Sequence, residues 1–285
     1  FKDQSSYESL YSAILLSLRD YIYKNGFTKV VFGLSGGIDS ALAAALSVDA
    51  TGYENVNCFM LPSKFTSQNS NDDAVDLANR LNIELENLSI EEVYNSVEIL
   101  LHKNFDKMEK DITEENIQSR VRALLLMAIS NKFGNMLIST SNKSESAVGY
   151  STLYGDMSGG FAPLKDVWKT DVIGLCNWRN KNFPKISKFQ EINIIPKNII
   201  SKPPTAELRE NQKDSDSLPE YDQLDKILAS AIEDMKSEEE IIALGYDQKI
   251  VIKVLNLLRN SEYKRFQSPP GPKLGKKAFG RDRMY

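Results

Sequence analysis

Apolar residues recur at every third or fourth position over residues 9–23, which predicts an amphipathic first helix. Residues 29–34 form a short, β-branched run that ends at a glycine-rich turn, so they are a predicted strand. The same reasoning predicts strands at residues 55–61, 83–88 and 136–140, and helices at residues 41–46, 70–81, 90–101 and 113–132. Strands that alternate with helices indicate an α/β fold, in which an open, mainly parallel sheet carries helices on both faces.

The chain beyond Pro163 is expected to be mainly helical. Helices are predicted at residues 166–180, 222–236, 237–244 and 247–259, and a strand-like stretch at 192–200. The segment from Lys264 to Tyr285 carries seven Lys and Arg residues against one Asp, which is typical of a solvated terminal arm. We therefore expect one domain over residues 1–265 and a basic tail over residues 266–285.

Composition narrows the possible functions. The formal net charge of −4 argues against nucleic acid as the main partner, and the longest apolar run, seven residues at 123–129, is too short to cross a membrane. Cys58 and Cys176 lie far apart in apolar contexts, which favours a reducing cytoplasm over a disulfide or zinc scaffold. The single histidine, His102, has no catalytic neighbours, so any chemistry must proceed without a histidine base.

The sharpest motif follows the first predicted strand. A strand, a Ser-Gly-Gly turn and a helix start would place unpaired N–H groups around an anion. The motif comprises Gly33, Leu34, Ser35, Gly36, Gly37, Ile38, Asp39 and Ser40. Asp39 suits a phosphate site only if a divalent cation bridges it to the phosphates. The motif lacks the Gly-Lys-Ser/Thr ending of a Walker A loop, and a plain glycine-rich turn is the alternative.

Ser35-Gly-Gly-Ile-Asp-Ser40 resembles the signature of the N-type ATP pyrophosphatases, which cleave ATP between the α- and β-phosphates and adenylate an acceptor oxygen. This family includes NAD, GMP, asparagine and argininosuccinate synthetases and tRNA-thiolating enzymes. The resemblance implies an adenine-nucleotide α-hydrolase-like, Rossmann-like fold. The loop alone does not choose among the members.

Further blocks favour NAD synthetases, because these blocks resemble the corresponding segments of that family and occur in the same order. They lie at residues 139–145, 149–160, 163–169, 201–208 and 263–265. The tail segments 267–273 and 279–283 look like the ending of glutamine-dependent NAD synthetases. The resemblance implies ATP-dependent amidation of deamido-NAD to NAD through an NAD-adenylate, with AMP and pyrophosphate as products. No glutaminase domain is expected in this chain, so ammonia would be free or delivered from a glutaminase domain or subunit.

The resemblance also assigns roles to single residues. It implies Mg²⁺ on Asp39 and Glu145, and catalytic roles for Asp39 and Lys169. Besides the loop, it implies that ATP contacts Thr140, Lys169 and Thr205. Deamido-NAD is expected to contact Arg120, Glu145, Asp156, Tyr263 and Lys264. For most of these residues the alternative is an ordinary solvated charge or a strand-end hydroxyl.

The resemblance further implies a homodimer, for which the helix at 113–132 is our candidate interface; an ordinary core helix is the alternative. We expect residues 62–69 and 201–218 to order over bound ATP as a lid. Two other functions stay open: another N-type ATP pyrophosphatase such as a tRNA-thiolating enzyme, and a nucleotide-binding module without catalysis.

Overall fold

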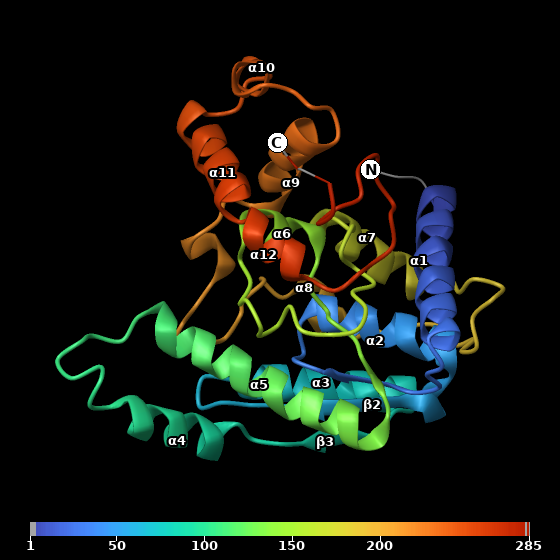
Figure 1. Ribbon diagram of the computed structural model, residues 1–285. Coiled ribbons are helices and arrows are strands. Elements are labelled where there is room, and N and C mark those ends of the chain that lie inside the picture. The colour runs from blue at the N-terminus through green and yellow to red at the C-terminus, as the bar shows by residue number, and fades with distance from the viewer. Residues whose placement is uncertain (1–3, 283, 285) are drawn as a thin grey trace.

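The computed structural model describes all residues except 1–3, 283 and 285. Its centre is a sheet in the order β3 (Leu85–Asn87), β2 (Val56–Met60), β1 (Val30–Gly33) and β4 (Met136–Leu137), in which all neighbouring strands are parallel (Figure 1). The predicted parallel α/β fold is confirmed. The fourth strand is shorter than predicted, because only an isolated bridge from Ile138 to Phe161 continues it.

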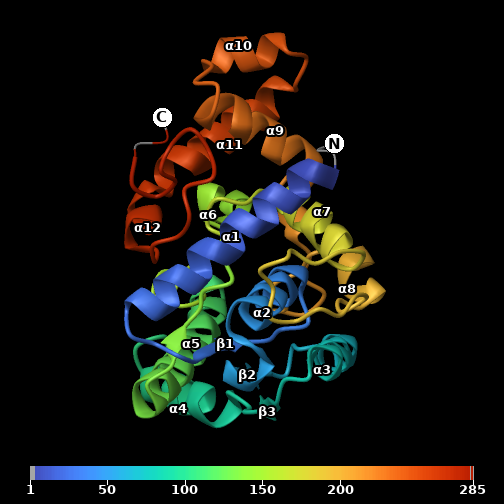
Figure 2. The same ribbon diagram turned by 90° about the vertical axis from the view of Figure 1, so that its right-hand side faces the viewer.

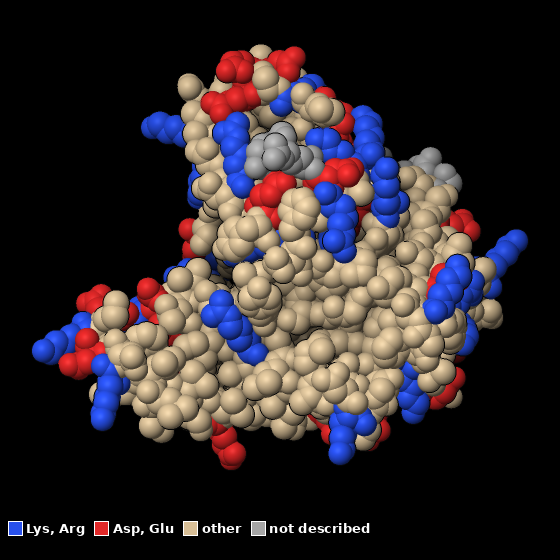
Figure 3. All heavy atoms as spheres, viewed as in Figure 1, with Lys and Arg blue, Asp and Glu red and all other residues tan. Residues whose placement is uncertain are grey.

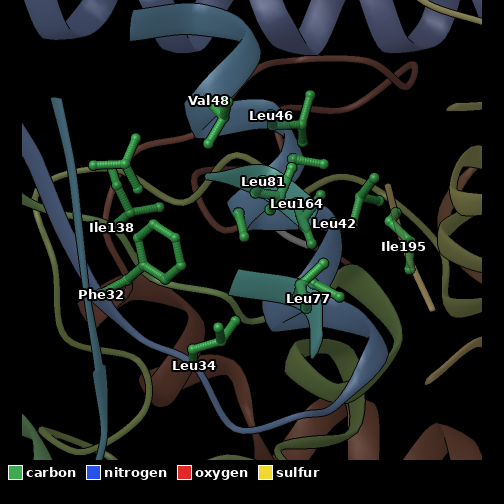
Figure 4. Close-up of a cluster of buried hydrophobic side chains, with 14 of the residues drawn as sticks. Phe32, Leu34, Leu42, Leu46, Val48, Leu77, Leu81, Ile138, Leu164 and Ile195 are labelled. Atoms are coloured by element: carbon green, nitrogen blue, oxygen red, sulfur yellow. The ribbon is translucent and has the colours of Figure 1, made fainter. Parts of the chain in front are cut away.

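Successive side chains of β1 point to opposite faces of the sheet, so they belong to two different apolar clusters. Val30 and Phe32 join one cluster with α1 (Gln4–Lys24), α2 (Ile38–Thr51), α3 (Gln68–Leu81) and α7 (Lys169–Arg179), part of which Figure 4 shows. Val31 joins the other cluster, together with residues of α5 (Ile112–Phe133) and of the segment leading into α4 (Glu91–Leu101). Helices therefore cover both faces of the sheet, as the sequence predicts.

Local signals explain several helix ends. A capping box between Asp111 and Glu114 starts α5, and Gly134 in the left-handed region ends it. Ser67 caps α3, which therefore begins before the predicted Ser70. The remaining helices are α6 (Lys143–Val148), α8 (Lys197–Ser201), α9 (Tyr221–Ile232), α10 (Glu238–Ala243), α11 (Gln248–Asn260) and α12 (Glu262–Gln267), with 3-10 turns at Tyr53–Asn55 and Asp214–Asp216.

Helices α9 to α12 lie together above the sheet layer (Figures 1 and 2). Their core is separate from the two sheet-facing clusters and also contains residues of α6.

The basic tail is not the solvated arm that its charge predicts. Phe279 and Met284 are buried in the α9–α11 core, and the Lys165 ammonium donates to the carbonyl oxygen of Pro269 at 2.6 Å. The Asp166 carboxylate accepts hydrogen bonds from two backbone N–H groups of the tail. The tail packs because its apolar residues and carbonyl groups find buried partners. Arg283, the last residue of the 279–283 motif, lies outside the described residues.

The strand-like prediction at 192–200 is wrong. The segment is irregular up to Pro196 and then forms the short helix α8. The Asn180 side chain accepts from the N–H of Ile195 and donates to its carbonyl oxygen, both at 2.8 Å. A side chain thus satisfies the backbone groups that a neighbouring strand would otherwise pair.

Helix α7 begins at Lys169, three residues later than predicted, because Trp168 keeps an extended backbone. None of the described helices has the length and apolar content that a membrane-spanning segment needs.

Candidate active site

The turn between β1 and α2 leaves the start of α2 open. Gly37 occupies the N-cap position and no side chain caps the helix, so N–H groups of its first turn face outward. The hydroxyls of Ser35 and Ser40 lie 3.1 Å apart, and Ser40 also donates to the carbonyl oxygen of Gly37 at 2.9 Å. This arrangement of free N–H groups and hydroxyls is suited to an anionic group such as a phosphate.

Gly36 has a structural reason to be glycine. Its φ is +72°, and a Cβ atom there would lie 2.1 Å from the carbonyl oxygen of Ser70 on α3. The loop is therefore pressed against α3, and only glycine fits this position.

Three elements bring charged groups together next to the loop. The Lys169 ammonium, on the first turn of α7, donates to Asp39 Oδ2 at 2.5 Å and to Glu145 Oε1 at 2.9 Å. Asn142, the N-cap of α6, donates its side-chain amide to Asp39 Oδ1 at 2.9 Å and accepts the N–H of Glu145. One lysine thus pairs with two carboxylates that are 106 positions apart in the sequence, and the three groups together carry a charge of −1 when all are ionised.

Burial and close contact between charges shift the pKa values of Glu145 and Lys169. Desolvation raises the pKa of Glu145 to about 7, although the neighbouring ammonium acts in the opposite direction. Desolvation alone would lower the pKa of Lys169, but Asp39 and Glu145 outweigh it, so that this pKa is raised. The lysine therefore stays protonated, and burial brings the pKa of Glu145 close to neutral.

The cluster lies in a pocket of about 300 Å³ at the carboxyl ends of the strands. This pocket brings together most of the predicted site residues. Its lining includes Gly33, Leu34, Ser35, Gly37, Ile38, Asp39, Ser40, Thr140, Glu145, Asp156, Lys169 and Thr205.

Three predicted contacts of deamido-NAD do not line this pocket in the described part of the chain. Arg120 donates to the carbonyl oxygen of Leu153 at 3.2 Å, and Lys264 donates to the carbonyl oxygens of Gly149 and Ser151. Tyr263 is exposed on α12. Arg120 and Lys264 thus support the 149–156 segment, whose Asp156 does line the pocket. Their contact with substrate stays a prediction.

Two other residues, which the sequence motifs do not predict, line the pocket. Arg122, which reads as a helix surface charge, lines the pocket and donates to the carbonyl oxygen of Leu61 at 2.9 Å; burial lowers the pKa of its guanidinium to about 10. Asp214 lines the pocket too, and accepts from the Tyr221 hydroxyl at 2.8 Å. Burial raises its pKa. No local motif marks either residue, because only the folded chain turns them toward the site.

Glu207 is a further residue that only the fold places. Its carboxylate accepts from the hydroxyls of Ser67 and Ser70, at 2.8 and 2.7 Å, and from the N–H of Ser67. Lys202 donates to Ser70 at 2.8 Å. The loop after α8 is thereby fastened to the start of α3, across one wall of the pocket.

Comparisons with known proteins show the family of the chain. The sequence profile described as NAD synthase matches residues 10–268. The chain belongs to the NAD synthase family. A glutamine-dependent NAD(+) synthetase of Rhodobacter capsulatus is 54% identical over 278 residues, which are 98% of this chain and 50% of that protein.

Solved structures of the NAD synthase family and its neighbours are similar in fold. A glutamine-dependent NAD+ synthetase of Acinetobacter baumannii, in complex with ADP, is 43% identical, with a TM-score of 0.66 over 98% of this chain and 49% of that one. An NMN synthetase of Francisella tularensis is 26% identical, with a TM-score of 0.75 over 93% of this chain and 97% of that one. The chain spans about half the length of the curated relatives it matches.

The raised pKa of Glu145 predicts how cation binding depends on pH. Below about pH 7 a proton competes with a divalent cation for this carboxylate, so we expect the affinity for magnesium-ATP to rise between pH 6 and pH 7.5 and to level off above. The affinity for magnesium-ATP should change by up to about tenfold per pH unit in this range. Calorimetric titration at several pH values measures it. Glu145→Gln should keep only the slope that ATP's own titration causes; an equal slope in both proteins would contradict this assignment.

Proposed function

We propose that the chain is an amide-forming ligase that converts deamido-NAD, ATP and ammonia to NAD, AMP and pyrophosphate. One observation carries this proposal. The uncapped start of α2, which suits an anion, lies in the same pocket as the Asp39–Lys169–Glu145 cluster. Membership in the NAD synthase family supports the choice of substrate. Two free, buried cysteines are consistent with action in a reducing cytoplasm.

In the first step the nicotinate carboxylate attacks the α-phosphorus of ATP, and the bond to the bridging oxygen of the β-phosphate breaks. The Ser35–Ser40 turn receives the departing pyrophosphate with its N–H groups and hydroxyls. The Lys169 ammonium stabilises the negative charge that develops on the phosphates. Catalysis by positioned charge explains why the site needs no histidine.

The residues of the cluster also fit Mg²⁺. No group of three or more His, Cys, Asp and Glu side chains in the described residues could hold a metal ion. A protein nevertheless usually supplies only one or two carboxylates to a magnesium ion that is bound to a nucleotide. The phosphates of the nucleotide and water molecules supply the other ligands. Asp39 and Glu145 would hold the ion, and their buried charges give it a favourable place. Bound Mg²⁺ would neutralise phosphate charge.

In the second step ammonia attacks the carbonyl carbon of the NAD-adenylate, the bond to the AMP oxygen breaks, and a proton is released. Water must be kept from this intermediate, because hydrolysis would waste it. The loop 201–218, fastened by Glu207 to α3, forms the cover that this step needs. A glutaminase domain is a further proposed partner, since relatives twice as long are named glutamine-dependent.

The two alternatives fit the structure less well. A tRNA-thiolating enzyme needs a basic surface or reactive cysteines, whereas Cys58 and Cys176 are buried and burial raises both thiol pKa values. A purely binding module has no need for a buried lysine held between two carboxylates.

We also propose a homodimer through α5. Leu124, Met127 and Phe133 are exposed on this helix, at 62, 37 and 70%, and the segment that leads to it exposes Met108. Few charged side chains lie over α5 on the face that Figure 3 shows. The linker between α4 and α5 projects from the body of the molecule, where a second copy could cover it (Figure 1).

The activity is tested by incubating the chain with ATP, Mg²⁺, deamido-NAD and ammonium. We expect AMP and NAD in equal amounts, with no AMP when deamido-NAD is omitted. Asp39→Asn should lower turnover at least about 100-fold, because it unbalances the cluster on which the phosphates rest. Asp76→Asn, an exposed carboxylate paired with Arg80 on α3, is the matched control and should keep full activity. Formation of ADP instead of AMP would refute the proposed reaction.

The lid is tested by limited proteolysis. Glu207→Gln weakens hydrogen bonds to a charged acceptor by about 1.5 kcal/mol in total, which corresponds to roughly tenfold more frequent opening. We expect faster cleavage within residues 201–218, and protection of the wild type by ATP plus deamido-NAD. Glu210→Gln, in the same loop but exposed, should cleave at the wild-type rate. Equal cleavage of the wild type with and without ligands would contradict the lid.

The dimer is tested by light scattering during size-exclusion chromatography. Leu124→Asp introduces a charge on the exposed apolar stripe of α5 and should convert a dimer to a monomer, since burying an unpaired carboxylate costs several kcal/mol. Leu16→Asp, at an exposed leucine of α1, should leave the mass unchanged. A wild-type chain that elutes as a monomer at high concentration would refute the interface.

A further inference from the structure

The first turn of α7 lacks a cap of its own. Trp168 at the N-cap position makes no side-chain capping bond, so the N–H groups of Lys169 and Thr170 need acceptors from elsewhere. The Lys169 N–H donates to Ser144 Oγ at 2.9 Å, and the Thr170 N–H donates to Asp225 Oδ2 at 3.0 Å. The helix start that carries the cluster's lysine is thus held by residues of α6 and α9.

Asp225 is the centre of this arrangement. It is 5% exposed, and its carboxylate accepts the Ser144 hydroxyl at 2.5 Å and the Thr170 hydroxyl at 2.9 Å, besides the Thr170 N–H. Ser144 therefore acts as a link: it accepts from the Lys169 N–H and donates to Asp225. Because Ser144 precedes Glu145, one carboxylate fixes the starts of the two helices that supply Glu145 and Lys169.

Asp225 does not line the pocket, so it does not touch a bound nucleotide there. Helices α6, α7 and α9 pack against one another around it (Figure 2). We propose that Asp225 is a positioning residue, which holds Lys169 and Glu145 in the register that the adenylation step requires. This inference rests on the proposed function and adds to it a residue that acts only through its neighbours.

The chemistry requires a carboxylate at this position. All three groups that face Asp225 are hydrogen-bond donors. An asparagine has one acceptor oxygen, which the Thr170 N–H would take; its NH₂ group would then face Ser144. Ser144 would have to accept from two N–H groups, and its own hydroxyl hydrogen would lose its partner. The starts of α6 and α7 would separate slightly, and Lys169 would leave its position between the two carboxylates.

The test uses Asp225→Asn, Ser144→Ala and their double variant. Deamido-NAD-dependent exchange of labelled pyrophosphate into ATP reports the adenylation step without ammonia. We expect kcat for exchange to fall about 10- to 100-fold in each single variant, as for other residues that orient a reacting group. The double variant should lose no more than the worse single one, because both changes break the same link.

A second measurement reads Lys169 directly. Acylation of lysines by a small reagent, followed by peptide mass spectrometry, should modify Lys169 at least about threefold faster in Asp225→Asn, since the amine is no longer held between carboxylates. Asp222→Asn removes a carboxylate from an exposed position in the first turn of α9, the helix that carries Asp225, and is the matched control; exchange and acylation should stay at wild-type values.

The outcomes separate the two proposals. Absence of exchange in the wild type would refute the proposed function, while the acylation result would still decide the role of Asp225. If Asp225→Asn keeps the wild-type kcat for exchange and the wild-type rate of Lys169 acylation, the inference is overturned. A lower melting temperature in that variant would then show that Asp225 has a structural role only. If Asp225→Asn does not fold, Ser144→Ala alone decides, because it removes a single hydroxyl and must show both effects.

Discussion

The ion pairs of Lys169 with Asp39 and Glu145 are the constraint on which the rest of the site depends. Two carboxylates with little exposure to water repel each other and lose hydration, so they are stable together only with a cation between them. The lysine supplies that cation. Its position must therefore be held closely, and the surrounding helices do so with hydrogen bonds to backbone groups.

This requirement explains the architecture around the pocket. Asp39 comes from the first turn of α2, Glu145 from α6 and Lys169 from α7, and each helix begins near the carboxyl ends of the strands. Helix starts have free N–H groups, which favour negative charge nearby. The same geometry that accommodates the carboxylates thus prepares a place for phosphates. A second core of α9, α11 and the chain's end supports this edge from above.

The cluster also connects binding with chemistry. Lys169 is fully charged in the folded protein, whereas the pKa of Glu145 near 7 leaves its charge sensitive to what binds. In the proposed reaction, a nucleotide with its cation would bring charges of both signs and so would change the partners of all three residues at once. The loop that Glu207 fastens to α3 borders the same pocket, and the proposed lid role would keep water from these charges and so strengthen the interactions among them.

The sequence by itself determined the parallel α/β sheet and the glycine-rich turn that opens α2. Both depend on neighbouring residues: the alternation in β1, and a Ser-Gly-Gly turn that directly follows it. The resemblance in separated motifs also pointed to Glu145 and Lys169. Only the tertiary structure placed Arg122 and Asp214 in the pocket wall and Asp225 beneath α7, because their partners are distant in sequence.

For the same reason the predicted strand at 192–200 and the predicted solvated tail were wrong. There, Asn180 and Lys165 satisfy backbone groups that local pattern assigns to a strand or to solvent. Propensity reports what a segment prefers alone; a buried polar group takes whichever partner the folded chain brings within hydrogen-bonding distance.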